Sequence, residues 1–120
     1  MTQTTPSRME AACSLLAESE RRYLLYQLAE TRRGNLEDVI SEIAAWERGE
    51  SGSVDSEYRQ QVYVSLIHNH LPRLADYDII DYDLRSGDIV LAEGFDEIRP
   101  LLEQFKQTES ESEIRETPLP

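Results

Sequence analysis

The chain has 120 residues, enough for one domain with a single hydrophobic core. It carries 24 acidic and 12 basic residues, a net charge of −12, yet 39% of its residues are hydrophobic. Its one cysteine, Cys13, excludes an internal disulfide and a cysteine-based zinc site. No apolar run approaches the ~20 residues of a membrane span.

The acidic residues are spread along the whole chain, so they indicate an acidic coat on a folded protein. Such a coat is typical of proteins from halophiles, because concentrated salt screens the repulsion between surface charges. An ordinary acidic interaction domain is the alternative. The start, "MTQTTPSRMEAAC", lacks the pattern of a signal peptide, and we expect a cytoplasmic protein. Cys13 falls on an apolar helix face, where a small core residue is expected.

Both ends of the chain are polar, contain proline and lack periodicity. We therefore expect residues 1–6 and 108–120 to be disordered, which leaves 7–107 as the domain. Apolar residues at helical spacing predict four helices in its first part. They span residues 7–17, 19–33, 35–48 and 55–74, with Ser7, Ser19, Asn35 and Asp55 at their starts. Trp46, near the end of the third helix, is expected to pack in the core or against a loop.

After these helices the apolar period changes from helical spacing to alternation. The segment "IIDYDL" (79–84) alternates apolar and acidic residues, and "IVLAE" (89–93) alternates back after the turn "RSGD". This pattern predicts a β-hairpin. A last helix, 95–106, has apolar residues along one face and Pro100 as a possible kink.

This order of elements predicts a mostly α fold with a small β-hairpin. It is the order of a winged helix-turn-helix domain with an additional N-terminal helix and a C-terminal helix. In such a core the third helix enters the DNA major groove, and the hairpin forms the wing.

The segments "RRYLLYQLAE", "VYVSLIHNHLPRLADYDIIDYD" and "IVLAE" carry a more specific likeness. They resemble a haloarchaeal family of winged-helix domains, mostly of unknown function, over about residues 10–105. That family is distantly similar to the ArsR and PadR regulators, in which a His-Leu-x-x-Leu run closes the recognition helix. Here the run starts at His70. The usual glycine before the first wing strand is replaced by Asp78, which also tolerates left-handed backbone geometry.

The His-x-His pair, His68 and His70, is not expected to bind a metal. Residues two apart on a helix point in nearly opposite directions, whereas metal ligands on a helix are three or four apart. We expect His70 to be a core histidine bonded to backbone, and His68 to lie on the outer face. Ser65 and His68 share a face, but no acid orients the histidine, so we expect neither a nucleophile nor a catalytic site. We expect no metal or other cofactor.

The outer face of helix 55–74 is the candidate DNA-reading surface. Residues 55–75 carry no net charge, so the acidity of the chain spares this segment. Polar side chains on it suit base edges and phosphates. The expected DNA contacts are Tyr58, Gln61, Ser65, His68, Asn69 and Arg73 on the helix, with Arg85 at the hairpin turn. A plain solvated helix surface is the alternative.

The hairpin region is strongly acidic, which disfavours a wing that lies on phosphates. Residues 76–97 carry eight acids, and Arg85 is their one basic residue. The expected function is a homodimeric transcriptional regulator that binds double-stranded DNA. The alternative is a winged-helix interaction module that docks a protein partner through the acidic hairpin. Dimerisation is expected through the C-terminal helix, by Phe95, Ile98, Leu102 and Phe105.

Overall fold

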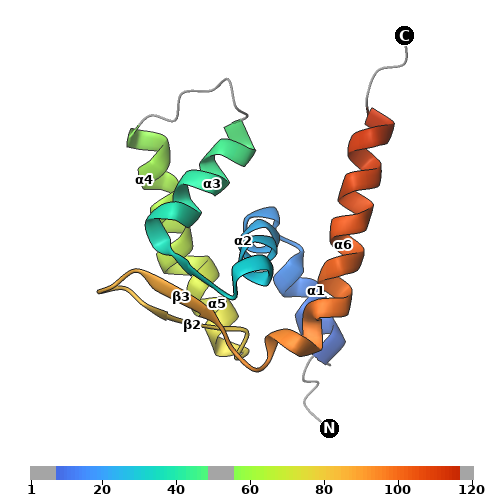
Figure 1. Cartoon of the computed structure of the whole chain (residues 1–120), viewed down its shortest axis with the longest axis horizontal. Helices are drawn as coiled ribbons and strands as arrows, with labels where there is room; N and C mark the ends of the chain where they lie inside the picture. The colour runs from blue at the N-terminus through green and yellow to red at the C-terminus, as the bar shows by residue number, and fades with distance from the viewer. Residues whose placement is uncertain (1–7, 49–55, 117–120) are drawn as a thin grey trace, which may run out of the picture.

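The computed structural model describes residues 8–48 and 56–116, so the expected cap at Ser7 and the expected disorder of residues 1–6 lie outside it. Figure 1 shows a helical body with a β-hairpin on one side and a long C-terminal helix on the other. The elements are α1 (Arg8–Leu16), α2 (Ser19–Thr31), β1 (Arg33–Asn35), α3 (Leu36–Arg48), α4 (Ser56–Ser65), the π-helical segment η1 (Leu66–His70), α5 (Leu71–Asp76), β2 (Ile80–Asp83), β3 (Asp88–Leu91) and α6 (Phe95–Glu116). The predicted order of helices and hairpin is confirmed, and the fold is winged-helix-like.

Helix α2 ends two residues earlier than its apolar pattern predicts. Arg32 adopts a left-handed conformation (φ 67°) and its N–H bonds the carbonyl of Leu28 at 2.6 Å. This closes the helix before Gly34. At its other end Glu18, not Ser19, flanks the helix, with extended backbone and no side-chain cap bond.

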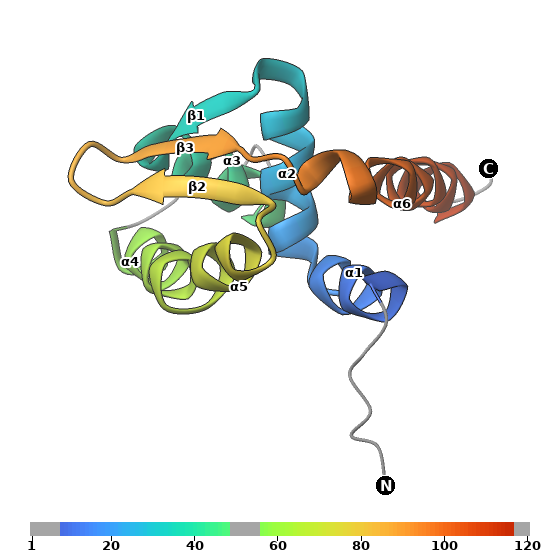
Figure 2. The same ribbon diagram turned by 90° about the horizontal axis from the view of Figure 1, so that it is seen from below.

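Residues Arg33–Asn35 then form β1, a strand that the sequence pattern did not predict. It pairs antiparallel with β3, and β3 pairs with β2, which gives a three-stranded sheet in the order β1-β3-β2. Figure 2 shows the three strands side by side, with α4 and α5 along one side of them. The wing is therefore attached to the body through β1 as well as through its own ends.

The start of α3 follows the prediction. The side-chain oxygen of Asn35 accepts the N–H of Glu37 at 3.0 Å, which is the bond expected of an N-cap residue. The prediction that Trp46, near the end of α3, packs in the core or against a loop is wrong. The residue is 38% exposed, and its ring stacks on that of Tyr23 on α2, with the ring centroids 4.5 Å apart.

Helices α4, η1 and α5 form one continuous helical rod over residues 56–76. Its middle is π-helical, and the N–H of Leu71 bonds the carbonyl of Leu66, five residues back. Pro72 follows directly. A proline ring in a regular α-helix collides with the carbonyl four residues earlier and cannot donate to it. We attribute the uninterrupted rod to the wider π-helical turn, which leaves room for the ring.

The hairpin was predicted correctly, although both strands are shorter than their alternating patterns. Gly87 has a left-handed φ of 82° and its N–H bonds the carbonyl of Asp83 at 2.8 Å, which closes the turn. Asp78 takes up φ 61° ahead of β2. The prediction that aspartate would serve here in place of glycine is confirmed.

One core cluster joins the body to α6. Its most deeply buried large side chains are Leu16, Leu24, Leu25, Leu28, Ile43, Leu66, Leu71, Leu74, Ile80, Ile89 and Phe95. Phe95, Ile98 and Leu102 belong to this cluster and are at most 6% exposed. The prediction that they form a dimerisation face is therefore wrong, because their own protomer covers them. Cys13, expected in the core, is exposed.

Helix α6 continues to Glu116, beyond residue 107, where the domain was expected to end. Glu109 shows why the helix persists: its carboxylate accepts bonds from the guanidinium of Arg22 and the hydroxyl of Tyr26, both on α2. Pro100 lies inside α6. The first part of the helix runs at an angle to the rest in Figure 1, as expected for a proline kink.

Candidate nucleic-acid interface

The rod α4–η1–α5 presents an exposed polar face, as predicted for a DNA-reading helix. Gln61, His68, Asn69 and Arg73 are all exposed, and Val64 between them is 41% exposed. Tyr58 differs from the prediction, because it is half-buried and packs against the core cluster. The face is therefore narrower than the sequence pattern predicts, and its exposed residues run from Gln61 to Arg73.

Arg73 is held in position by a neighbour on the same face. Its Nε donates to the side-chain oxygen of Asn69 at 2.8 Å, one helical turn away. This bond uses one of the five guanidinium donors, and the residue is exposed. Arg59 is different, because its guanidinium bonds Ser41 and Glu37 of α3. Of these two arginines on the rod, Arg73 is therefore the one better placed to contact a phosphate.

Ser65 does not lie on the outer face, and that part of the prediction is wrong. Its hydroxyl donates to a carboxylate oxygen of Glu20 on α2 at 3.2 Å and lies 3.1 Å from the Nε2 of His70. The π-helical turn that begins after Ser65 changes the rotation per residue. Positions assigned on a regular helical wheel consequently shift across this stretch.

His70 is buried, as predicted, but its partners are side chains rather than backbone. Its Nδ1 lies 3.1 Å from Nη1 of Arg21 and its Nε2 lies 2.9 Å from Glu20. Arginine is a donor only, so Nδ1 must accept, and the proton of the neutral ring sits on Nε2 and is donated to Glu20. Arg21 also donates to the carbonyls of Leu15 and Ser14. One arginine therefore connects α1, α2 and the rod.

The carboxylates around this network differ in their protonation behaviour. Hydrogen bonding from His70 lowers the pKa of Glu20, against the opposing effect of burial. Burial raises the pKa of Glu47 on α3, and its hydrogen bond with Glu20 adds to that rise. Burial lowers the pKa of the Arg21 guanidinium. Glu20 is thus the preferred site of negative charge in this group.

The Ser65, His70 and Glu20 group does not have the geometry of a nucleophilic triad. In a triad the histidine accepts the serine proton, whereas here the Nε2 next to Ser65 carries the proton and Nδ1 is occupied by Arg21. His70 is also only 3% exposed, which leaves no route for a substrate. The arrangement fixes helix positions rather than activating an oxygen.

The structure separates the two histidines of the His-x-His pair, since His68 is exposed and His70 is buried. The prediction that they point to different sides is confirmed. Within residues 8–48 and 56–116, no three His, Cys, Asp or Glu side chains lie together as metal ligands would. Among the helices in those same ranges, none is long and apolar enough to cross a membrane.

The wing places Arg85 at its exposed turn, as predicted. The backbone N–H of Arg85 donates to the side chain of Asp83. The side chain of Arg85 takes no part in this bond of the turn. Asp81, Asp83 and Asp88 are exposed along the strands. Sequence reasoning missed Arg33, which β1 brings next to the wing, 3.7 Å from Asp88. Its side chain is 67% exposed and adds a second cation to this edge.

Comparison with known proteins gives one family. The family model described as "Domain of unknown function (DUF7344)" matches residues 13–90, more than half of the chain. The match begins in the second half of α1, runs through the helices of the body and β2, and ends within β3, before α6. No curated protein and no solved structure matches the chain significantly.

Proposed function

We propose that this chain, which belongs to the family described as Domain of unknown function (DUF7344), is a winged-helix protein that binds double-stranded DNA. It acts through binding rather than catalysis, as a homodimeric transcriptional regulator in the cytoplasm of a halophilic archaeon. Its likeness to the ArsR and PadR regulators belongs to the same proposal.

The observation that carries the proposal is an exposed polar helix face next to a wing. Gln61, His68 and Asn69 offer donors and acceptors for base edges, and Arg73 offers a cation for a phosphate or a guanine. Arg85 at the wing turn and Arg33 at its edge would meet the backbone beside the groove. These are the two parts with which winged-helix proteins hold a duplex.

The distribution of charge favours this surface over others of the molecule. Residues 55–75 carry no net charge, although the chain as a whole carries −12. In molar salt the Debye length falls to about 3 Å, so the acids outside the rod would repel a duplex only weakly. Specific hydrogen bonds to bases would keep their value under the same conditions.

The test compares two sets of variants by fluorescence anisotropy on genomic fragments. Replacing Gln61 and Asn69 together by alanine should weaken binding to the preferred fragment, at ~1–3 kcal/mol for each lost base contact. Arg85→Ala should weaken binding to all fragments about equally and reduce the salt dependence. Gln104→Ala, an exposed change on α6, is the control and should leave binding unchanged.

The conditions should run from about 0.1 M to about 3 M potassium chloride, since low salt exaggerates repulsion from the acids. Failure of the wild type to bind any fragment over that whole range would remove the DNA-binding proposal. Unfolding curves of each variant show that a loss of binding is not a loss of fold.

The homodimer is part of the proposal, because two copies would present two rods to successive major grooves. Of the four residues first expected at the interface, Phe105 alone is half-exposed, with the guanidinium of Arg22 5.2 Å from its ring centre. Light scattering in molar salt should give the mass of a dimer. A monomer mass at high micromolar concentration would contradict it.

The acidic hairpin supports the alternative function, a docking module for a basic protein. Asp81 and Asp83 are exposed on β2, in a region where eight acids accompany one arginine. Asp81→Asn separates the two functions. It should tighten DNA binding slightly if the wing lies along a duplex, and it should weaken the complex if the hairpin docks a basic partner.

A further inference from the structure

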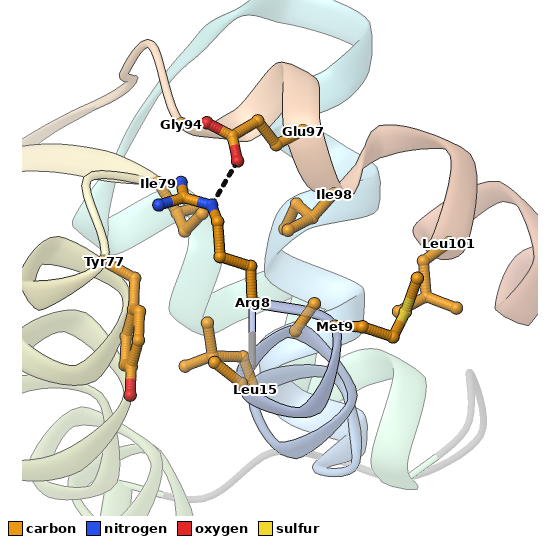
Figure 3. Close-up of a pocket in the computed structure, with 11 residues that line it drawn as sticks. Arg8, Met9, Leu15, Tyr77, Ile79, Gly94, Glu97, Ile98 and Leu101 are labelled. Carbon is orange, nitrogen blue, oxygen red and sulfur yellow. Dashed lines mark hydrogen bonds and ion pairs between the residues drawn. The ribbon is translucent and has the colours of Figure 1, made fainter. Parts of the chain in front are cut away.

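A cleft of about 360 Å³ lies between α1, the turn that leads into β2, and the first turns of α6. Figure 3 shows side chains from all three segments turned towards it. Its floor is apolar and built from core residues, including Leu15, Ile79 and Ile98, each at most 6% exposed. Tyr77, 50% exposed, stands at one side. This size and lining are those of small-molecule sites in proteins.

Arg8 shows which chemistry the cleft accepts. Its aliphatic stem lies among the apolar lining residues and its Nε donates to Glu97 at 2.6 Å (Figure 3). The side chains of Arg8 and Glu97 are 79% and 56% exposed, so solvent screens the pair and it holds Arg8 weakly. The side chain of Arg8 therefore occupies the cleft as a ligand of this kind would, with an apolar stem in the cleft and a cationic group bound to Glu97.

The charges next to the lining residues have one prevailing sign. Asp76 and Asp78 flank Tyr77 in the chain, and Glu93 precedes Gly94, another lining residue. Among the described residues that line the cleft, Arg8 is the one cation, and its charge is matched by Glu97; Arg99, which follows Ile98, is paired with Asp96. The surroundings therefore attract a positive ligand and repel a negative one.

We propose that this cleft is a binding site for a small organic cation with an apolar body, such as an arylalkyl amine. The body rests on the floor formed by Leu15, Ile79 and Ile98. The ammonium group bonds the carboxylate of Glu97 and displaces the guanidinium of Arg8 into solvent. The floor supplies most of the affinity, and the carboxylate selects the sign of the charge.

The site is connected to the rod, which gives it a regulatory use that rests on the proposed function. Leu15 lines the cleft, and its carbonyl accepts Nε of Arg21 at 2.6 Å. The same guanidinium reaches His70 on the rod. A ligand that shifts α1 would therefore act on the anchor of the DNA-reading helix through one side chain. By linkage, any effect of the amine on DNA affinity must be matched by an equal effect of DNA on amine affinity.

Three probes with one apolar body test the charge selection by isothermal titration calorimetry on the full chain without DNA. They are 4-phenylbutylamine, 4-phenylbutan-1-ol and 4-phenylbutanoate. The amine should bind most tightly, the alcohol more weakly and the carboxylate most weakly. Equal or tighter binding of the carboxylate overturns the proposal, and so does the absence of binding by all three at millimolar concentration.

Glu97→Gln tests the assigned carboxylate. It should weaken the amine about two- to fivefold, as loss of a solvent-screened ion pair does, and leave the alcohol unchanged. It should strengthen the carboxylate probe, because Arg8 is released from its partner. Glu103→Gln removes the same charge from an exposed position of α6 outside the lining and should change none of the three. If both variants weaken the amine equally, the effect is general electrostatics and the site is wrong.

Tyr77→Ala tests the apolar part, since Tyr77 is half exposed and its loss spares the core. All three probes should weaken together. Should Tyr77→Ala instead convert a dimer to a monomer with no effect on the probes, the cleft is an interface with a second copy and the proposal falls. Binding of the amine without any change in DNA affinity overturns the regulatory link alone. Absence of DNA binding refutes the proposed function but not the site, which is measured without DNA.

Discussion

The guanidinium of Arg21 carries a charge into the helical core, where the residue is only 4% exposed. Two backbone carbonyls and the imidazole of His70 satisfy its donors. The carboxylate of Glu20 lies on the opposite edge of the imidazole ring, 2.9 Å from its Nε2. His70 therefore links a cation to an anion while remaining neutral itself. Removal of any member would leave buried polar groups without partners, which is costly.

Glu47 gives a pH-dependent prediction at the residue scale. Because burial and Glu20 raise its pKa, the folded state favours the protonated form. Its contribution to stability is then fully present below the pKa of the unfolded chain, about 4.3, and is lost as pH rises through the folded value. Glu47→Gln mimics the protonated form. It should raise the free energy of unfolding by ~0.2–1 kcal/mol at neutral pH, a modest gain because solvent screens the pair.

The measurement is urea unfolding of wild type and variant at about pH 4 and about pH 7. The gain should vanish at the lower value, where Glu47 is already protonated. Glu42→Gln, an exposed change on the same helix, is the control for a general loss of negative charge. An equal gain from both variants at both pH values would contradict the assignment to the Glu20 neighbourhood.

At the scale of elements, the hydrogen bonds of one acid on α6 add to the shared core cluster that joins this helix to α2. Glu109 accepts from Arg22 and from Tyr26, and burial together with this bond raises the pKa of the Tyr26 hydroxyl. Glu109→Ala should lower the free energy of unfolding by about 1–2 kcal/mol, because it leaves two half-buried donors without an acceptor. Glu103→Ala, exposed on the same helix, should change it by less than about 0.5 kcal/mol. Equal losses in thermal or urea unfolding would show that α6 owes its position to its apolar face alone.

The elements that the sequence predicts well are those fixed by local pattern and local caps. Asn35 caps α3 through a residue two positions away, and the hairpin follows from a glycine turn between alternating segments. β1 escapes prediction because its three residues have no local signal and are stabilised by pairing with β3, far along the chain. The extension of α6 likewise depends on the contacts of Glu109 with α2, which is far away in the sequence. Long-range contacts therefore determine both β1 and the length of α6.

The candidate surface was predicted in part for a related reason. Exposed positions such as Gln61, His68 and Asn69 follow from helical spacing. Ser65 does not, because the π-helical turn after it is set by how the rod packs and by Pro72, and no periodicity records it. The burial of Phe95 within its own protomer likewise depends on where the kinked α6 meets the body. An apolar stripe alone does not say what covers it.

At the scale of the whole molecule, a net charge of −12 on 120 residues must repel itself. Added salt screens that repulsion, with a Debye length of about 30 Å at 0.01 M and about 3 Å at 1 M. The melting temperature should therefore rise from tens of millimolar to molar potassium chloride. Differential scanning calorimetry across that series checks it. A flat or falling curve would return the chain to the class of ordinary acidic interaction domains.

The pairing of β1 with β3 sets the order in which the molecule can assemble. Arg33 pairs with Val90, so the sheet forms only when β1 and β3 meet. The chain between these two strands is a long loop that contains α3 and the whole rod. Loop closure of this length is slow compared with helix formation, so the helices have time to form first. The amide of Leu91, which bonds the carbonyl of Arg32, should gain protection from hydrogen exchange late in refolding. A chain halted before residue 88 would contain the helical rod yet lack β3, the strand that pairs with both β1 and β2.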